Sequence, residues 1–362
     1  MIVAQLFEPL ALAGVVLKNR IGIPPMCQYS AVDGVAQDWH LVHYGSRAAG
    51  GAGVIIVEAT AVTPEGRISP ADLGLWTDAQ IAPLAKIAGF MRAQGAVAAI
   101  QLAHAGRKGA AALGWQEQKT LSPEEGGWTT VAPSAIAFGD GYAVPRELDL
   151  AGIAAVVRCF VDATRRAKAA GFQALEIHAA HGYLLHQFLS PLSNQRNDAY
   201  GGSFANRSRL TREVVAAVRA EWPQGAPLLL RLSATDWVAG GWDIEETVEL
   251  CRVVKDMGVD LIDVSTAGLV PTAKIPVGPG FQTEFAARIR REAGIATAAV
   301  GLITSAAQAA QVLHSGQADL VLLGRELLRD PYWPLHAARE MGTAVAWPSQ
   351  YLRAAPAGTP PR

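Results

Sequence analysis

Cysteine is scarce in this chain of 362 residues. Cys27, Cys159 and Cys251 lie far apart, and no C-x-x-C motif is present. This pattern excludes a disulfide framework, a four-cysteine zinc site and a local iron–sulfur cluster motif. We therefore expect reduced thiols and a cytoplasmic protein. Cys159 and Cys251 fall on apolar faces of expected helices and are predicted to be core residues.

Charge is also sparse, and it is balanced. Charged residues make up 17% of the chain, and 31 Lys and Arg against 32 Asp and Glu give a formal net charge of −1. A nearly neutral chain gives no electrostatic reason to expect a nucleic acid or an anionic membrane as partner. No stretch of about 18 apolar residues is free of charges, so no membrane-spanning helix is predicted. Half of the residues are hydrophobic, which is enough for a large core.

One pattern recurs along the chain: a helical stretch ends at a glycine, and a short apolar run follows. The runs cover residues 54–57, 97–102, 174–177, 261–264, 297–300 and 320–323. Glycine suits the left-handed position that ends a helix, and apolar runs without alternation are typical of strands covered on both faces. Two further runs, 20–25 and 228–232, bring the expected strands to eight.

Eight strands that each precede a helix predict a (β/α)₈ TIM barrel. The barrel is expected to form a single domain over residues 1–355. Asp149 and Asp243 are predicted to cap two of its helices. The alternative is an open, doubly wound sheet, but no G-x-G-x-x-G motif follows the first strand.

Three segments stand outside this regular pattern. The apolar run 10–17 is predicted to be an N-terminal element that packs on the body. About residues 105–148 separate the third strand from its helix, and their four aromatic side chains (Trp115, Trp128, Phe138 and Tyr142) predict a packed lid. Residues 356–362 are predicted to be a disordered tail.

Polar side chains gather where the expected strands end, which is where barrel enzymes place their active sites. They follow six of the strands and include Met26, Cys27, Gln28, Tyr29, Glu58, Gln101, His104, Glu176, His178, His181, Tyr183, Arg231 and Arg325. Such convergence predicts an enzyme.

His178 and His181 allow three interpretations. They could bind zinc with a third ligand, donate two N–H groups to a substrate oxygen, or form structural hydrogen bonds. Tyr183 favours the donor interpretation, because a phenol with an ordinary pKa of ~10 stays protonated at neutral pH and can act as a general acid. A metal-dependent barrel hydrolase that uses both histidines is the alternative function.

The segment from His178 to Arg207 resembles the signature of the old yellow enzyme family. Residues 24–29 and 101–108 resemble its subgroup of xenobiotic reductases and thermophilic-like ene-reductases. The resemblance implies an FMN-dependent enzyme that takes hydride from NAD(P)H and reduces the activated C=C bond of α,β-unsaturated carbonyl or nitro compounds. The related dienoyl-CoA reductases add an iron–sulfur cluster and a further domain, for which this chain lacks the cysteines and the length.

The resemblance also implies which residues hold FMN. Four would lie against the flavin ring: Pro25, Met26, Cys27 and Ala59. Three would hold the phosphate: Gly301, Gly324 and Arg325. Gln101 would bond the pyrimidine edge, and Arg231 would lie beside N1, where a cation favours the reduced flavin. An inert core thiol at Cys27 and a salt-bridged rim arginine at Arg325 are the alternatives.

For catalysis, the resemblance implies that His178 and His181 bind the substrate oxygen. Tyr183 would protonate the substrate carbon, and Tyr29 and Cys27 would shape the pocket.

The resemblance extends to the end of the chain. Residues 349–353 match a C-terminal stretch whose arginine, here Arg353, enters the active site of a neighbouring subunit. This implies a homo-oligomer, either a dimer or a tetramer. Ala354 and Ala355 stand where the family has glycine and tryptophan, and a solvated arginine is the alternative.

Overall fold

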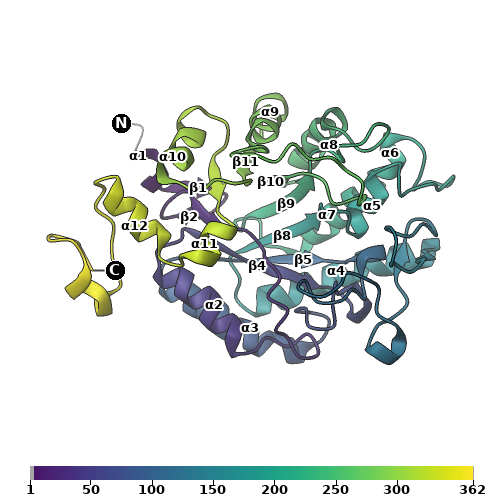
Figure 1. Cartoon of the computed structure of the whole chain (residues 1–362), viewed down its shortest axis with the longest axis horizontal. Helices are drawn as coiled ribbons and strands as arrows, with labels where there is room; N and C mark the ends of the chain where they lie inside the picture. The colour runs from purple at the N-terminus through teal and green to yellow at the C-terminus, as the bar shows by residue number, and fades with distance from the viewer. Residues whose placement is uncertain (1–3, 362) are drawn as a thin grey trace.

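Eight parallel strands close into a barrel in the computed structural model, which describes residues 4–361 (Figure 1). Around the barrel the strands are β3 (Ile21–Ile23), β4 (Val54–Ala61), β5 (Val97–Ala103), β8 (Ala174–Ala179), β9 (Leu228–Ser233), β10 (Leu261–Ser265), β11 (Ala296–Ala299) and β12 (Leu320–Leu322). β12 pairs with β3 and closes the ring. The predicted barrel is confirmed, and the open sheet is wrong.

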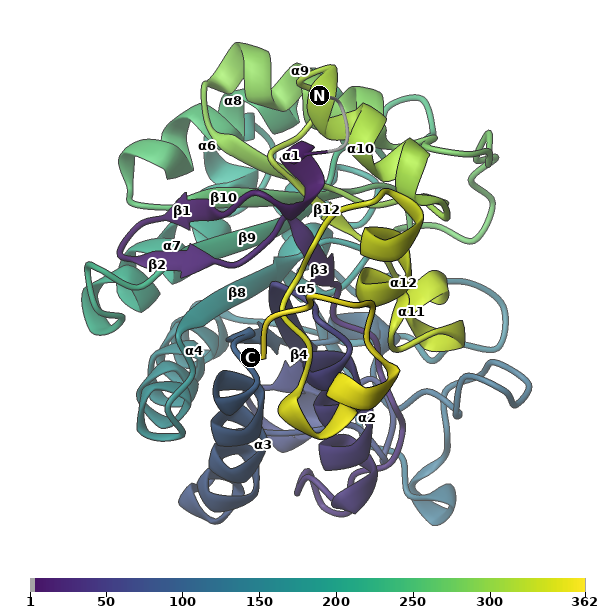
Figure 2. The ribbon, with the colours of Figure 1, turned by 90° about the vertical axis from the view of Figure 1, so that its left-hand side faces the viewer.

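Helices follow the strands and cover the outside of the barrel (Figures 1 and 2). They are α2 (Asp38–Ala49), α3 (Ile81–Ala93), α4 (Leu150–Ala169), α5 (Leu184–Leu189), α6 (Phe204–Arg207), α7 (Arg209–Glu221), α8 (Ile244–Asp256), α9 (Thr283–Ala293), α10 (Ala306–His314), α11 (Arg325–Arg329) and α12 (Trp333–Glu340); the short α1 (Ala4–Phe7) precedes the barrel. Both predicted caps are confirmed, because Asp149 accepts the Gly152 N–H and Asp243 accepts the Glu246 N–H. None of the helices within residues 4–361 is long and apolar enough to cross a membrane.

A hairpin of β1 (Leu10–Leu12) and β2 (Val15–Leu17) closes the amino-terminal end of the barrel. Leu12 and Leu17 pack against interior side chains of the barrel strands, including Val54 and Leu229. The predicted N-terminal element is confirmed. Because this end is filled by apolar side chains, the open end lies where the strands finish.

The connection between β5 and α4 contains η3 (Gly106–Lys108), η4 (Pro123–Glu125), β6 (Val131–Ala132) and β7 (Arg146–Glu147). Its aromatic side chains differ in packing. Phe138 meets Tyr142 edge to face at 5.0 Å between ring centroids, whereas the Trp115 side chain is 70% exposed. The lid role of this segment stays a prediction.

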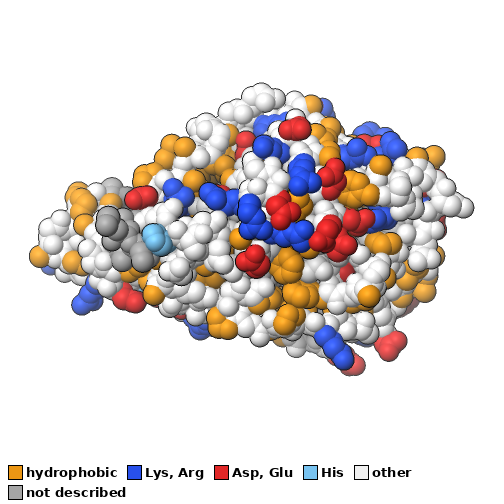
Figure 3. Space-filling model, turned by 90° about the horizontal axis from the view of Figure 1, so that it is seen from above, with side chains coloured by type: hydrophobic (Ala, Val, Ile, Leu, Met, Phe, Trp, Pro, Cys, Tyr) orange, Lys and Arg blue, Asp and Glu red, His pale blue; other side chains and the backbone are white. Residues whose placement is uncertain are grey.

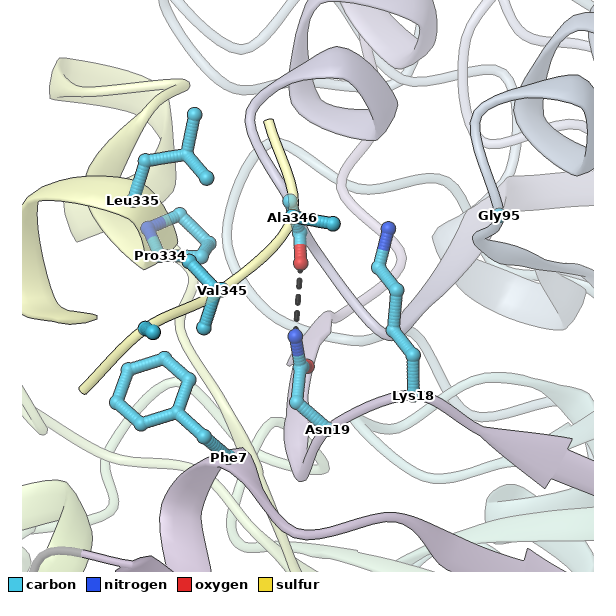
Figure 4. Close-up of a pocket in the computed structure, with 10 residues that line it drawn as sticks. Phe7, Lys18, Asn19, Gly95, Pro334, Leu335, Val345 and Ala346 are labelled. Atoms are coloured by element: carbon cyan, nitrogen blue, oxygen red, sulfur yellow. Dashed lines mark hydrogen bonds between the residues drawn. The ribbon is translucent and has the colours of Figure 1, made fainter. Parts of the chain in front are cut away.

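The chain after α12 forms an arm that contains η5 (Ser349–Ala354) and lies at the hairpin end of the barrel (Figures 1 and 2). A cavity of about 300 Å³ separates the base of the arm from the body. Figure 4 shows Asn19 and Ala346 pointing toward each other there, beside Lys18. An isolated bridge joins Trp347 to Pro361. Residues 1–3 of the predicted domain and residue 362 of the predicted tail lie outside the described residues, and the disorder of the tail stays a prediction.

The outer face over α8, α9 and α10 carries both signs of charge side by side (Figure 3). Arg288 contacts Glu245 and Glu292, and Arg290 contacts Asp319. Mixed charges of this kind make no attractive field for a polyanion.

Candidate active site

The three predicted catalytic side chains come together at the carboxyl end of β8. The ring centroids of His178 and His181 are 5.3 Å apart, and those of His178 and Tyr183 are 5.0 Å apart, both edge to face. His178 lies in β8, and Tyr183 immediately precedes α5. Each side chain is therefore placed by the strand-to-helix turn that the sequence motif encodes.

The two histidines are neutral and differ in their hydrogen bonds. Burial, reinforced by the nearby Arg231 cation, lowers the pKa of both imidazoles well below its usual value. The Ala180 N–H donates to Nδ1 of His178 at 3.3 Å, which leaves the ring proton on Nε2. Nε2 of His181 lies 2.7 Å from the Ser265 hydroxyl, so Nδ1 is its nitrogen left for a ligand.

The backbone at His181 is held in an unusual conformation. Its φ is +57°, in the left-handed region that side-chain-bearing residues rarely adopt. The Ser233 hydroxyl accepts the His181 N–H at 2.9 Å, and Lys108 Nζ donates to the His181 carbonyl at 2.9 Å. Nδ1 of His186 accepts the next amide, that of Gly182. These contacts from three other elements stabilise the strained turn and fix where His181 and Tyr183 point.

Tyr183 remains a phenol at neutral pH. Burial, followed by the nearby Cys27 and Tyr29 groups, raises its pKa well above the ordinary value. Lys108 Nζ lies 5.0 Å from the centroid of the Tyr183 ring. A protonated hydroxyl beside a neutral imidazole donor can act as a general acid.

The loop after β3 is anchored by a buried carboxylate. Glu58 on β4 accepts the Gln28 N–H at 2.7 Å and the Tyr44 hydroxyl at 3.0 Å. Burial, assisted by Asp72 and Glu58, raises the pKa of the Cys27 thiol well above its usual value, so the thiol is neutral. Tyr29 meets Trp115 of the β5–α4 connection edge to face at 5.6 Å.

A cavity of about 280 Å³ lies between the carboxyl ends of β9, β10, β11 and β12. Its lining includes the predicted cofactor residues Arg231, Gly301, Gly324 and Arg325, together with Ser265, Gln282 and Arg329. Gly301 has φ +129°, and a Cβ there would lie 3.1 Å from the Phe281 ring. Three guanidinium groups and a close glycine backbone suit a phosphate-bearing cofactor such as FMN.

The other predicted ring contacts lie near this cavity. Arg231 Nη1 donates to the Pro25 carbonyl at 3.5 Å, and a Cβ on Gly324 would lie 3.6 Å from Met26 Sδ. Ala59 is buried at the same end of β4. Gln101 Nε2 donates to Glu176 at 2.8 Å. The structure thus brings the predicted cofactor residues together, whereas Arg353 is exposed and belongs to the arm, which lies at the hairpin end of the barrel.

Sequence analysis missed several residues of this site. Ser265 is the last residue of β10 and Gln282 lies after that strand, whereas the rim residues expected from the sequence include none from the ends of β10 and β11. Their signal was the Ser265–Thr266 pair directly after an apolar run. Arg329 could have been found as a second basic residue one turn after Arg325.

Comparison with known proteins decides the family. Residues 5–343 match the family model for the NADH:flavin oxidoreductase / NADH oxidase family. The chain belongs to this family. An NADPH dehydrogenase from Geobacillus thermodenitrificans is 51% identical over 350 residues, which cover 96% of this chain and 98% of that protein. An NADPH dehydrogenase from Listeria monocytogenes is 49% identical over 353 residues, with 97% and 99% covered.

Solved structures agree with this assignment. Morphinone reductase is 30% identical with a TM-score of 0.78, over 94% of this chain and 90% of that one. The old yellow enzyme homologue from Zymomonas mobilis is 28% identical with a TM-score of 0.78, over 92% of each chain. The predicted old yellow enzyme family is confirmed. The protein is an FMN-dependent oxidoreductase that uses NAD(P)H.

This family decides against the metal-dependent hydrolase. That alternative needed a third ligand beside His178 and His181. Among residues 4–361, no group of three or more His, Cys, Asp or Glu side chains is arranged to hold a metal ion.

Proposed function

We propose that this protein is an ene-reductase, which reduces the activated C=C bond of α,β-unsaturated carbonyl or nitro compounds. The observation that carries the proposal is the grouping of His178, a neutral N–H donor, with the protonated phenol of Tyr183, 5.0 Å away between rings. Similarity to morphinone reductase and to an old yellow enzyme homologue supports it. When bound, FMN supplies hydride transfer from NAD(P)H to the alkene.

In this proposal the residues that hold FMN form two groups. Gly301, Gly324 and Arg325 would hold the phosphate, and the Arg329 guanidinium lines the same cavity. The residues that would contact the flavin ring are Pro25, Met26, Cys27 and Ala59, and those that would contact its pyrimidine edge are Gln101 and Arg231.

The histidines and the tyrosine have different roles toward the substrate, namely oxygen binding and proton donation. His178, through Nε2, and His181, through Nδ1, hold the carbonyl or nitro oxygen. This oxygen gains negative charge when the β-carbon accepts a hydride, and donors placed there in advance stabilise that charge. Tyr183 gives its hydroxyl proton to the α-carbon, and one hydride plus one proton complete the reduction.

The pocket wall is assigned to Cys27 and Tyr29. The Cys27 thiol is neutral, so it offers a small uncharged surface to the substrate. Tyr29 touches Trp115 of the β5–α4 connection, which links the wall to the proposed lid. Lys108 Nζ lies 4.5 Å from the Phe138 ring centroid and ties the same connection to the His181 turn.

The cofactor content tests the first step of the proposal. Acid precipitation of the purified protein should release one FMN per chain, since every contact proposed for FMN is non-covalent. Chromatography of the supernatant identifies the flavin, and NADPH oxidation under anaerobic conditions should then depend on an added enone. Release of FAD, or an oxidation rate indifferent to the enone, would contradict the proposal.

We also propose that the protein is a homo-oligomer in which Arg353 acts in the site of a neighbouring copy. Arg353 is exposed on the arm, which lies at the hairpin end of the barrel, whereas His178 lies near the carboxyl end of β8. A cavity of about 590 Å³ lies between α12 and the arm, next to Tyr351. An arm that packs loosely on its own body is available to a second copy. The three free cysteines fit the cytoplasmic location that completes the proposal.

Subunit complementation tests the role of Arg353. A His178→Ala/His181→Ala chain mixed with an Arg353→Ala chain, under conditions shown to exchange subunits, should regain alkene reduction. Some of the mixed sites combine intact histidines with an intact arginine. Arg158→Ala, which removes an exposed arginine on α4, is the matched control and should retain activity. An Arg353→Ala enzyme that is active by itself would remove the arginine from the site.

A further inference from the structure

Four buried polar side chains lie on neighbouring strands inside the barrel. Gln101 on β5, Glu176 on β8, Arg231 on β9 and Asp263 on β10 are each at most 6% exposed. Gln101 pairs in register with Glu176, and Arg231 pairs with Asp263. We call these four residues the polar layer. Two residues earlier on the same strands, the barrel interior is apolar: Ala99, Ala174, Leu229 and Leu261.

One hydrogen bond and one ion pair connect neighbouring members of the polar layer. Gln101 Nε2 donates to Glu176 Oε1 at 2.8 Å, and Arg231 Nε lies 3.0 Å from Asp263 Oδ2. The carboxyl groups of Glu176 and Asp263 interact electrostatically, and Glu176 Oε2 and both Asp263 oxygens have no hydrogen-bond partner among the described residues. Two ionised carboxylates offer only acceptors, so a proton on one of them would supply the donor that these buried oxygens lack.

The charges indicate which carboxyl group holds the proton. The layer has two acids and one cation. A second negative charge beside the apolar interior of the barrel would raise the free energy of the folded protein. Asp263 contacts the Arg231 guanidinium and is therefore the better anion. Glu176 has a neutral amide as its other partner and is therefore the better acid. Burial, together with the Asp263 charge, raises the pKa of Glu176 well above its ordinary value.

We propose that Glu176 and Asp263 share one proton, held by Glu176, and that both act as positioning residues for the flavin. The proton leaves the polar layer neutral, so that Asp263 moderates the positive charge that Arg231 presents. It also fixes the Gln101 amide: with Nε2 bound to Glu176, the carbonyl oxygen and the second N–H of Gln101 remain for the pyrimidine edge. This inference rests on the proposed roles of Gln101 and Arg231.

Reduction potentials of the bound flavin test the charge of each acid. Glu176→Gln keeps an oxygen for Gln101 and gives an N–H to Asp263, so its potential should equal that of the wild type. Asp263→Asn leaves Arg231 uncompensated, and the affinity for reduced over oxidised FMN should rise on the order of tenfold. For a two-electron couple this is about 30 mV. Glu249→Gln, which replaces an exposed acid on α8, is the control.

Infrared spectroscopy tests the proton itself. The carbonyl stretch of a protonated carboxylic acid, which shifts in D₂O, should be lost in Glu176→Gln and kept in Glu249→Gln. Any other buried acid, such as Asp72, contributes the same band to the wild-type and variant spectra, so its contribution cancels in the difference spectrum. The apoprotein suffices, so this result does not depend on FMN binding or on alkene reduction.

Three outcomes would overturn the inference. The first is a carboxylic acid band that persists in Glu176→Gln. The second is a flavin reduction potential that rises in Glu176→Gln, as it would if a negative charge had been removed. The third is a flavin reduction potential that stays unchanged in Asp263→Asn. If Asp263→Asn fails to fold, the reduction potential and the infrared band of Glu176→Gln still test the inference. A protein that binds FMN but does not reduce alkenes would refute the proposed function and leave this inference standing.

Discussion

Replacing Tyr183 by phenylalanine is expected to slow alkene reduction by ~10²–10⁴, the usual contribution of a general acid. The phenol is needed when the α-carbon takes its proton, whereas reduction of the flavin by NAD(P)H requires no such proton. Stopped-flow measurement of the two half-reactions should therefore show a loss confined to the second. The phenylalanine ring can keep the edge-to-face contact with His178, so the site remains packed.

Tyr200→Phe is the matched control for this experiment. It removes a phenol whose hydroxyl donates to Glu213, and it should leave the second half-reaction unchanged. If Tyr183→Phe impairs the first half-reaction alone, Tyr183 has a different role. Nitroalkenes should show a smaller loss than enones, because water can protonate their more stable anions.

Replacing His178 by alanine is expected to cost ~10²–10³ in the rate of alkene reduction. The variant removes the Nε2–H that stabilises the developing negative charge. The same change should weaken the binding of phenols to the oxidised enzyme, since a phenolate oxygen mimics the charged substrate oxygen. Titration followed by the visible spectrum of the flavin measures this affinity.

The control for the histidine experiment is His336→Ala, on the exposed surface of α12. It should leave both the rate and the phenol affinity unchanged. Replacing His178 and His181 together should abolish tight phenol binding. Unchanged phenol affinity in the double variant would refute the assignment of the histidines as donors.

The barrel was predictable because each strand can be recognised from its own short stretch of sequence. A parallel strand buried on both faces needs an uninterrupted apolar run, and a preceding helix ends at a glycine such as Gly51 or Gly171, whose φ values are +102° and +79°. The grouping of His178, His181 and Tyr183 was also predictable, since all three lie within one strand and its following turn.

Contacts between distant segments were not predictable in the same way. Glu176 and Asp263 each stand inside an apolar run, and β8 and β10 are separated by β9 in the barrel. Only the closed geometry brings the two carboxyl groups together. The contact of His181 with Ser265 spans 84 residues and depends on the same closure. The location of Arg353 depended on the course of the arm, since an extended segment of that length reaches either end of the barrel.

The hairpin of β1 and β2 closes one end of the barrel, so the active site is accessible only from the other end. Leu12 and Leu17 fill the closed end, so substrates would reach the cofactor, and products would leave it, at the end of the barrel that carries His178 and Tyr183. In the proposed reaction both reactants bind at this end, so the nicotinamide would leave before the alkene binds. A donor that visits in this way needs no dinucleotide-binding domain of its own, which accounts for an NAD(P)H-dependent enzyme without the G-x-G-x-x-G motif after its first strand.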